Sequence, residues 1–183
     1  MQKHLNRALL LFIIASSAVA ASTGARGVLF GDAFLNGNNL ETYAGVIPGD
    51  VIRTKQNVGA TLQSRYSVAL IAPDSVLRVE NKSLALEFGT INLRTGRDVD
   101  GMTANVAMDP AGVAVIAVQA RNFEVIPESA DLAEFEVTRS NGLIAVKAGK
   151  NGIVISCGSN KLRLEEGHRV STQDAPGCKF ISQ

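Results

Sequence analysis

The stretch Glu134-Phe-Glu-Val-Thr-Arg-Ser-Asn-Gly-Leu-Ile-Ala-Val-Lys147 decides the fold class of this chain. Apolar and polar residues alternate with period two on both sides of Asn141-Gly142, so each arm predicts a strand with one buried face. Asn-Gly is a favoured pair for a two-residue hairpin turn, because both positions tolerate positive φ. The stretch therefore predicts an antiparallel β-hairpin.

The rest of the chain repeats this pattern of short apolar runs separated by turn residues. Turn-forming Gly, Asn and Asp recur about every eight to twelve residues between short runs rich in Val, Ile, Leu, Phe and Thr. The pattern predicts one all-β domain, an antiparallel β-sandwich that is jelly-roll-like or β-solenoid-like, and the sequence leaves the two arrangements open. The predicted strands cover residues 27–35, 51–54, 60–63, 68–71, 76–79, 84–88, 91–94, 102–108, 113–118, 122–126, 134–139, 143–147, 153–156, 161–164 and 169–172.

The first twenty residues have the three-part pattern of a secretory signal peptide. Lys3, His4 and Arg7 form a basic start, an apolar run follows, and Ala18-Val19-Ala20 supplies the small residues that a signal peptidase reads. The apolar run has about 13 residues, short of the roughly 20 that span a bilayer as a helix. We expect cleavage after Ala20 and a periplasmic or secreted location, with an uncleaved inner-membrane anchor as the alternative.

Cleavage would leave 163 residues with 16 basic and 17 acidic side chains, which is enough chain for one domain with its own core. The charges are scattered singly and aromatic residues are few, so a nucleic-acid partner is not expected. No later stretch is long and apolar enough to span a membrane, so we expect no span in the mature chain.

The two cysteines of the chain are Cys157 and Cys178. In an oxidising compartment they favour a disulfide over two free thiols, and the bond would stabilise the fold by about 3 kcal/mol. It would tie the C-terminal tail back onto the body of the domain. Neither cysteine belongs to a Cys-x-x-Cys pair, so a redox-active site is not expected.

Several segments, taken in order, resemble the FecR domain family. Gly45-Val-Ile-Pro-Gly-Asp-Val-Ile-Arg-Thr54 is similar to the opening motif of that family, with Pro48, Gly49, Asp50 and Thr54 as its turn residues. The later matches are Ala60-Thr-Leu62, Val68-Ala-Leu-Ile71, Ala72-Pro-Asp-Ser75, Leu77-Arg-Val79, Leu86-Glu-Phe-Gly89, Ile91-Asn-Leu93, Asn122-Phe-Glu-Val125, Asn141-Gly-Leu-Ile-Ala-Val146 and Leu164-Glu-Glu-Gly167. The resemblance covers roughly residues 31–172, most of the mature chain.

The chain departs from the family pattern in two places. Ala120-Arg121-Asn122 stands where the family usually has Gly-Thr before its Phe-x-Val strand, and the loop from Thr95 to Pro110 fits poorly. We assign residues 1–20 to the signal peptide, 27–172 to a FecR-like β domain and 173–183 to the tail held by the predicted disulfide.

The resemblance implies a domain that works by contact. The best-known members sense an outer-membrane transporter and signal to a cytoplasmic sigma factor through a cytoplasmic segment and a spanning helix. This chain shows neither, so we expect a bare external domain that does not signal to a sigma factor alone.

The residues predict no catalytic, cofactor or metal site. His168 is the single histidine left after export, and it falls in a predicted turn, so neither a Ser-His-Asp arrangement nor a multi-histidine metal site is supplied. Zinc bound by Cys157, Cys178 and His168 would compete with the disulfide, and Asp98-Val-Asp100-Gly101 lacks the full calcium-loop pattern.

We therefore predict an exported, non-catalytic FecR-like module with an envelope protein as its partner and an unspecified oligomeric state. One alternative is an exported jelly-roll hydrolase or lyase, which would gather Asp74, Glu80 or Asp98 with Arg78 in a cleft. The other is a structural envelope protein that assembles with itself. A free strand edge would suit docking by strand addition.

Overall fold

The computed structural model describes residues 27–96, 117–129, 131–175 and 180–182. Within these residues every regular element is a β-strand, and none forms a helix that could cross a bilayer. The predicted all-β class is confirmed. The strands are β1 Gly27–Gly31, β2 Ala33–Leu35, β3 Asn38–Asn39, β4 Tyr43–Val46, β5 Val51–Thr54, β6 Ala60–Ser64, β7 Ser67–Ile71, β8 Val76–Val79, β9 Ser83–Thr95, β10 Ala117–Ala120, β11 Phe123–Pro127, β12 Ala133–Ser140, β13 Leu143–Lys150, β14 Ile153–Cys157, β15 Asn160–Leu164, β16 Arg169–Gln173 and β17 Ile181–Ser182.

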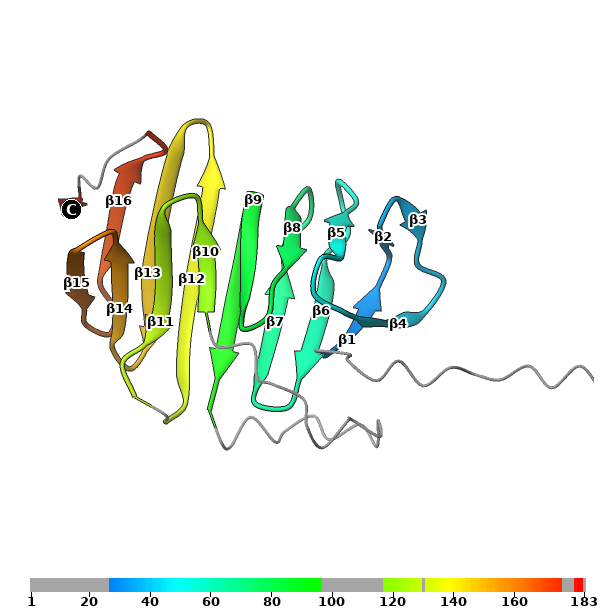
Figure 1. Ribbon diagram of the computed structural model, residues 1–183, viewed down its shortest axis with the longest axis horizontal. Coiled ribbons are helices and arrows are strands. Elements are labelled where there is room, and N and C mark those ends of the chain that lie inside the picture. Colours follow the sequence, from blue (N-terminus) through cyan, green and yellow to red (C-terminus); the bar gives the residue numbers. More distant parts are fainter. Residues whose placement is uncertain (1–26, 97–116, 130, 176–179, 183) are drawn as a thin grey trace, which may run out of the picture.

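The strands form two layers that share β9. Layer A has the order β4-β1-β6-β7-β9-β12-β13-β16-β17. Layer B has the order β3-β2-β5-β8-β9-β10-β11-β14-β15. Figure 1 shows the strands following one another along the long axis in nearly chain order, from blue to red. The structure is thus a sandwich that grows along its length as successive hairpins join one layer or the other.

One strand crosses between the layers at a sharp bend. Residues Ser83–Phe88 of β9 pair with β8 and β10 in layer B, whereas Gly89–Thr95 pair with β7 and β12 in layer A. Gly89 lies at the crossing with φ +98°, a conformation that favours glycine. The segments 84–88 and 91–94, predicted as separate strands, are therefore one continuous strand.

The inner face of each layer is apolar and the outer face is mixed, as period-two alternation requires. In layer A, Leu29, Leu62, Ala69, Leu93 and Phe135 are successive cross-strand partners and all lie in the buried core. A matching inner row of layer B runs through Val79, Leu84, Val118, Val125 and Ile155, which are buried too. Both rows belong to one continuous hydrophobic core.

Most predicted strands are present within a residue or two, and the differences have physical causes. The predicted strand 27–35 is divided at Asp32 into β1 in layer A and β2 in layer B, next to Gly31 with φ +111°. The Asn141-Gly142 hairpin has both residues at positive φ, as predicted. β9 and β10 pair in parallel, which departs from purely antiparallel pairing. The predicted strand 102–108 and most of 113–118 lie outside the described residues.

Candidate functional site

The family-motif turn Pro48-Gly49-Asp50 joins β4 to β5. Gly49 has φ +99°, and the Asp50 carboxylate accepts a hydrogen bond from the Ile47 backbone N–H at 2.8 Å. The same carboxylate accepts from Asn36 Nδ2 at 2.7 Å, while Asn36 Oδ1 accepts from the Val51 N–H at 2.9 Å. These hydrogen bonds connect the turn to the β2–β3 hairpin, and both carboxylate oxygens of Asp50 take part in them.

Thr54, the last motif residue, anchors the β7–β8 turn. It is buried, its Oγ1 donates to the Ala72 carbonyl at 2.7 Å, and the same oxygen accepts from the Ser75 N–H at 2.8 Å. Ser75 in turn accepts from the Thr90 N–H at 3.0 Å through its Oγ. Thr54 and Ser75 therefore hold the β7–β8 turn against the crossing strand β9. The described hydrogen bonds of Asp50 and Thr54 therefore connect strands and turns of the sandwich.

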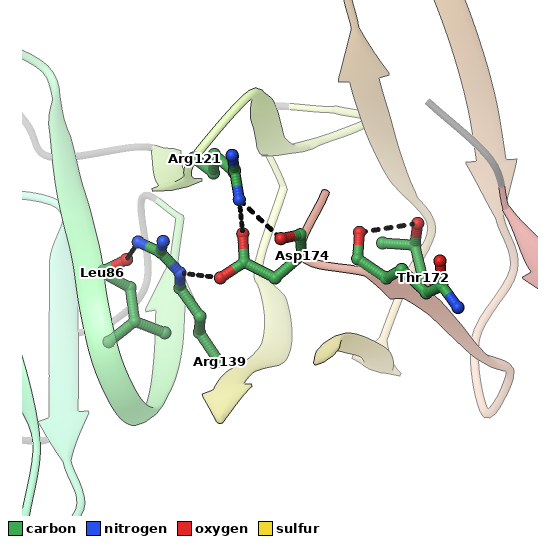
Figure 2. Close-up of polar contacts among 6 residues, drawn as sticks. Leu86, Arg121, Arg139, Thr172 and Asp174 are labelled. Atoms are coloured by element: carbon green, nitrogen blue, oxygen red, sulfur yellow. Dashed lines mark hydrogen bonds and ion pairs between the residues drawn. The ribbon is translucent and has the colours of Figure 1, made fainter. Parts of the chain in front are cut away.

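A second polar cluster is centred on Asp174 (Figure 2). Arg139 of β12 donates through Nε to Asp174 Oδ2 at 2.8 Å, and Arg121 of the β10–β11 turn donates through Nη1 to Asp174 Oδ1 at 3.1 Å. Arg139 also donates through Nη1 to the Leu86 carbonyl of β9 at 3.1 Å. The cluster, here called the corner clasp, ties the two layers together beside the β9 crossing.

In the corner clasp, Arg139 provides a hydrogen-bond donor for the backbone carbonyl of Leu86. Among the described residues, β10 pairs with Ser83, Leu84 and Ala85 of β9 and no strand pairs with that edge of β9 at Leu86, where β9 leaves layer B. Arg139 fills this position with a charge-assisted hydrogen bond, which is stronger than a neutral one. The sequence did not identify Asp174 or Arg139 because each reads alone as an ordinary surface charge.

The two arginines hold the pKa of Asp174 below its ordinary value of 3.8. Burial of the carboxyl group raises its pKa, but the hydrogen bonds and charges of Arg139 and Arg121 together outweigh that effect. The Asp174 side chain is 13% exposed, so the attraction is less screened by water than that of a fully exposed pair. Asp174 is therefore ionised across the neutral range.

Arg121 lies in the turn between β10 and β11 and has an unusual backbone conformation. It has φ +55° in the two-residue turn between Ala120 and Phe123, where glycine would be unstrained. Its guanidinium donates to both the backbone carbonyl and the carboxylate of Asp174. The ion pair therefore accompanies a strained backbone.

We expect Arg121→Gly to be about 1 kcal/mol more stable than Arg121→Ala, because both lose the ion pair and glycine alone relieves the positive φ. Urea unfolding of the two variants and the wild-type chain measures this difference. Equal stability of the two variants would show that the turn carries no strain.

Cys157 lies near the described end of the C-terminal tail. Cys157 is 1% exposed, is not a free thiol, and is the cross-strand partner of Phe123. The Phe180 ring packs edge-on against the Phe123 ring with a centroid distance of 5.7 Å, and β17 pairs with β16. Cys178 lies outside the described residues, so its bond to Cys157 stays a prediction.

Of the residues that the hydrolase alternative needed, the described ones, Asp74, Arg78 and Glu80, do not line one hollow together. Asp74 and Glu80 lie at opposite ends of β8, roughly 20 Å apart along an extended chain, and Arg78 pairs with Glu87 at 3.1 Å. Asp98 lies outside the described residues, as do Asp100 and Gly101 of the calcium-like loop. His168 is exposed in the β15–β16 turn, and no group of three metal-binding side chains occurs in the described ranges.

The side chains on the outer face of layer A change from mainly apolar to mainly charged along its length. One cross-strand row, here called the outer row, begins on the edge strand β4 with a tyrosine that is 66% exposed. Its successive members are Tyr43, Phe30, Thr61, Leu70, Asn92, Glu136, Lys147 and Arg169. The half of the row near β4 is apolar except for Thr61, and the half toward β16 is charged except for Asn92.

A shallow hollow of about 350 Å³ lies in the apolar half of the outer row. Phe30, Thr61 and Leu70 line it, together with Gly31, Gly59, Ala60 and Ile71. Gly31 and Gly59 contribute no side chain to the space. Leu70 is 44% exposed and the Phe30 and Tyr43 rings are 6.2 Å apart, so the hollow sits in an apolar surface. A second hollow of about 390 Å³ on layer B is more polar, with Glu80, Lys82, Gln119 and Glu124 in its lining.

Together the fold and these surfaces define a two-layer β-sandwich domain whose exposed features are strand edges and shallow hollows. No family model matches the chain, and no curated protein is similar to it in sequence. Among solved structures it is similar to a "putative anti-sigma factor" from Parabacteroides distasonis, at 14% identity and a TM-score of 0.50. A second crystal structure under the same description has 14% identity and a TM-score of 0.49.

The match covers 73% of this chain and 58% of that chain, so it spans less than two thirds of the solved protein. At 14% identity the likeness is one of fold. It agrees with the sandwich architecture described above.

Proposed function

We propose that this chain is an exported, FecR-like protein-interaction and sensing module of the bacterial envelope that works by contact rather than by catalysis. The order of the family motifs and the secretory pattern of residues 1–20 support the proposal. The fold likeness to a protein described as an anti-sigma factor agrees with a regulatory role.

The observation that carries the proposal is the apolar half of the outer row beside an open strand edge. β4 pairs only with β1 within the described residues, so its other edge offers unpaired backbone N–H and C=O groups. Tyr43 lies on this edge strand, and the hollow between Phe30 and Leu70 follows two strands away. An extended segment of a partner would pair with β4, and an apolar part of the partner flanking that segment would cover the hollow.

Site-specific photo-crosslinking in the native envelope tests this docking mode. A photoreactive residue at Tyr43 or Leu70 is expected to form an adduct with one distinct envelope protein. The same residue at Glu124, on the outer face of layer B, is expected to form none. Leu70→Asp, which places a charge beside the hollow, should remove the adduct formed from Tyr43. Equal adducts at all three positions, or adducts between two copies of this chain only, would contradict the proposal.

Export is tested independently of docking. The chain produced with residues 1–20 in a bacterial host is expected in the periplasmic or secreted fraction, with Ala21 as its new N-terminus. Intact mass and N-terminal sequencing measure both features. An uncleaved chain in the inner-membrane fraction would support the anchor alternative instead.

We also propose that Cys157 and Cys178 form the predicted disulfide in the exported protein. The proximity of Phe180 to Phe123, the cross-strand partner of Cys157, supports it, because Cys178 is two residues from Phe180. Peptide mapping without reduction should recover the two cysteines in one linked species. Cys178→Ser should lower the unfolding free energy by about 3 kcal/mol, the loop-closure value for this spacing. Unlinked peptides from the exported protein would contradict the bond.

A further inference from the structure

The edge strand β15 ends layer B at the opposite end of the molecule from β3. Its five residues pair only with β14 within the described part of the chain. Figure 1 shows β15 at the outer limit of the sandwich, beyond β14. An unpaired edge is a template for another strand unless something blocks it.

The hairpin geometry determines which backbone groups of β15 point outward. Cys157 and Asn160 flank a two-residue turn whose first residue, Gly158, has φ +58°. The pair that closes such a turn is hydrogen-bonded, and hydrogen-bonded and non-hydrogen-bonded pairs alternate from there along the ladder. Lys161 and Arg163 therefore direct their N–H and C=O groups away from β14, toward open solvent.

The charge order along this edge is complementary to itself in the antiparallel sense. Basic Lys161 and Arg163 lie in β15, and acidic Glu165 and Glu166 follow it directly at the start of the β15–β16 turn. A two-fold axis at Leu164 sets Arg163 opposite Glu165 of the second copy, twice. An axis at Leu162 would oppose Lys161 to Arg163 twice, and an axis at Arg163 would oppose two arginines although it would also set Lys161 opposite Glu165 twice. Like charges directly opposite destabilise strand pairs, so the Leu164 axis is favoured.

We propose that two copies of this chain pair through β15, antiparallel about Leu164, and join their B layers into one continuous sheet. The pairing is isologous, so each interaction occurs twice. Leu162 and Leu164 pack on the core side of β15, and the second copy extends that apolar side. The Arg163 side chain is 65% exposed and its contacts with Glu128 use Nε, which leaves the terminal nitrogens for Glu165 of the second copy.

Charge reversal on the full exported chain tests the pairing by sedimentation equilibrium. The wild-type chain is expected to dimerise with increasing concentration. Arg163→Glu and Glu165→Arg should each raise the dimer dissociation constant by about tenfold or more, because each variant opposes like charges twice. An equimolar mixture of the two variants should dimerise as the wild type does, since their charges are mutually complementary. The double variant should also regain the homodimer.

Two controls separate pairing from folding and from partner docking. Lys82→Glu makes the same charge change in the exposed β8–β9 turn and should leave the dimer unchanged. Leu70→Asp, which tests the partner site, should also leave it unchanged, so each proposal can fail alone. A wild-type chain that stays monomeric at its solubility limit would overturn the pairing. Single variants that still dimerise, or a mixture that stays monomeric while the variants are folded by circular dichroism, would do the same.

Discussion

Replacing Gly89 by alanine is expected to lower the free energy of unfolding by about 3–4 kcal/mol, which is exceptional for adding one methyl group. Gly89 has φ +98° where β9 crosses between layers. A Cβ atom there would lie 2.2 Å from Ser75 Oγ and 2.6 Å from Ser75 Cα, so backbone would have to move. The movement would disturb the hydrogen bonds that Ser75 makes with Thr90 and Thr54.

Gly142→Ala is the matched control for this prediction. Gly142 also has positive φ, +73°, but a Cβ there would meet nothing within 4 Å. Its replacement should therefore cost only the conformational penalty, about 1 kcal/mol. Urea denaturation with circular dichroism measures both values. Similar losses for the two variants would show that the Ser75 contact at the crossing is not the cause.

Replacing Asp174 by asparagine is expected to lower the free energy of unfolding at pH 7 by about 2–3 kcal/mol, because Arg139 and Arg121 lose their shared carboxylate. Arg139 is 23% exposed and would keep only its bond to the Leu86 carbonyl. Asp32→Asn is the control, since it breaks an exposed pair with Lys55 and should cost about 0.5 kcal/mol. Equal losses would mean that the corner clasp is no stronger than a surface ion pair.

We also expect the Asp174 carboxylate to make the free energy of unfolding depend on pH in the acid range. The pKa of Asp174 in the folded protein lies below its ordinary value of 3.8, so the unfolded chain takes up the proton first as pH falls. The stabilisation is therefore complete above the ordinary pKa and is lost as pH falls through the lower folded value. Asp174→Asn should show a correspondingly smaller loss of stability on acidification. If the unfolding free energies of wild type and variant fell by equal amounts as the pH was lowered, the result would contradict this assignment.

Local patterns in the sequence predicted most strands because their causes are local. The Asn141-Gly142 turn follows from residues that accept positive φ, and the alternation around it follows from one buried face. The division of residues 27–35 at Asp32 was not predicted, because alternation does not record a change of layer. The continuity of β9 was missed for the same reason, since Gly89 reads equally well as a break or as a bend.

The candidate sites were harder to predict because they depend on residues distant in the chain. The sequence singled out Asp50 and Thr54 as turn residues of a motif, but only the structure shows that their partners are Asn36, Ala72 and Ser75. Nothing in the sequence joins Arg121, Arg139 and Asp174, which lie 35 to 53 positions from the residues they bind. The outer row could not be predicted either, because its members become neighbours only through the pairing register of eight strands.

The sequence by itself determined the strand class, the turns and the inward apolar faces, since each depends on residues within one hairpin. Tertiary structure decided the assignment of hairpins to layers, the corner clasp and the two strand edges proposed for docking. Backbone hydrogen bonding between distant strands and the bend at Gly89 set those features, and both arise only when the layers close on a common core.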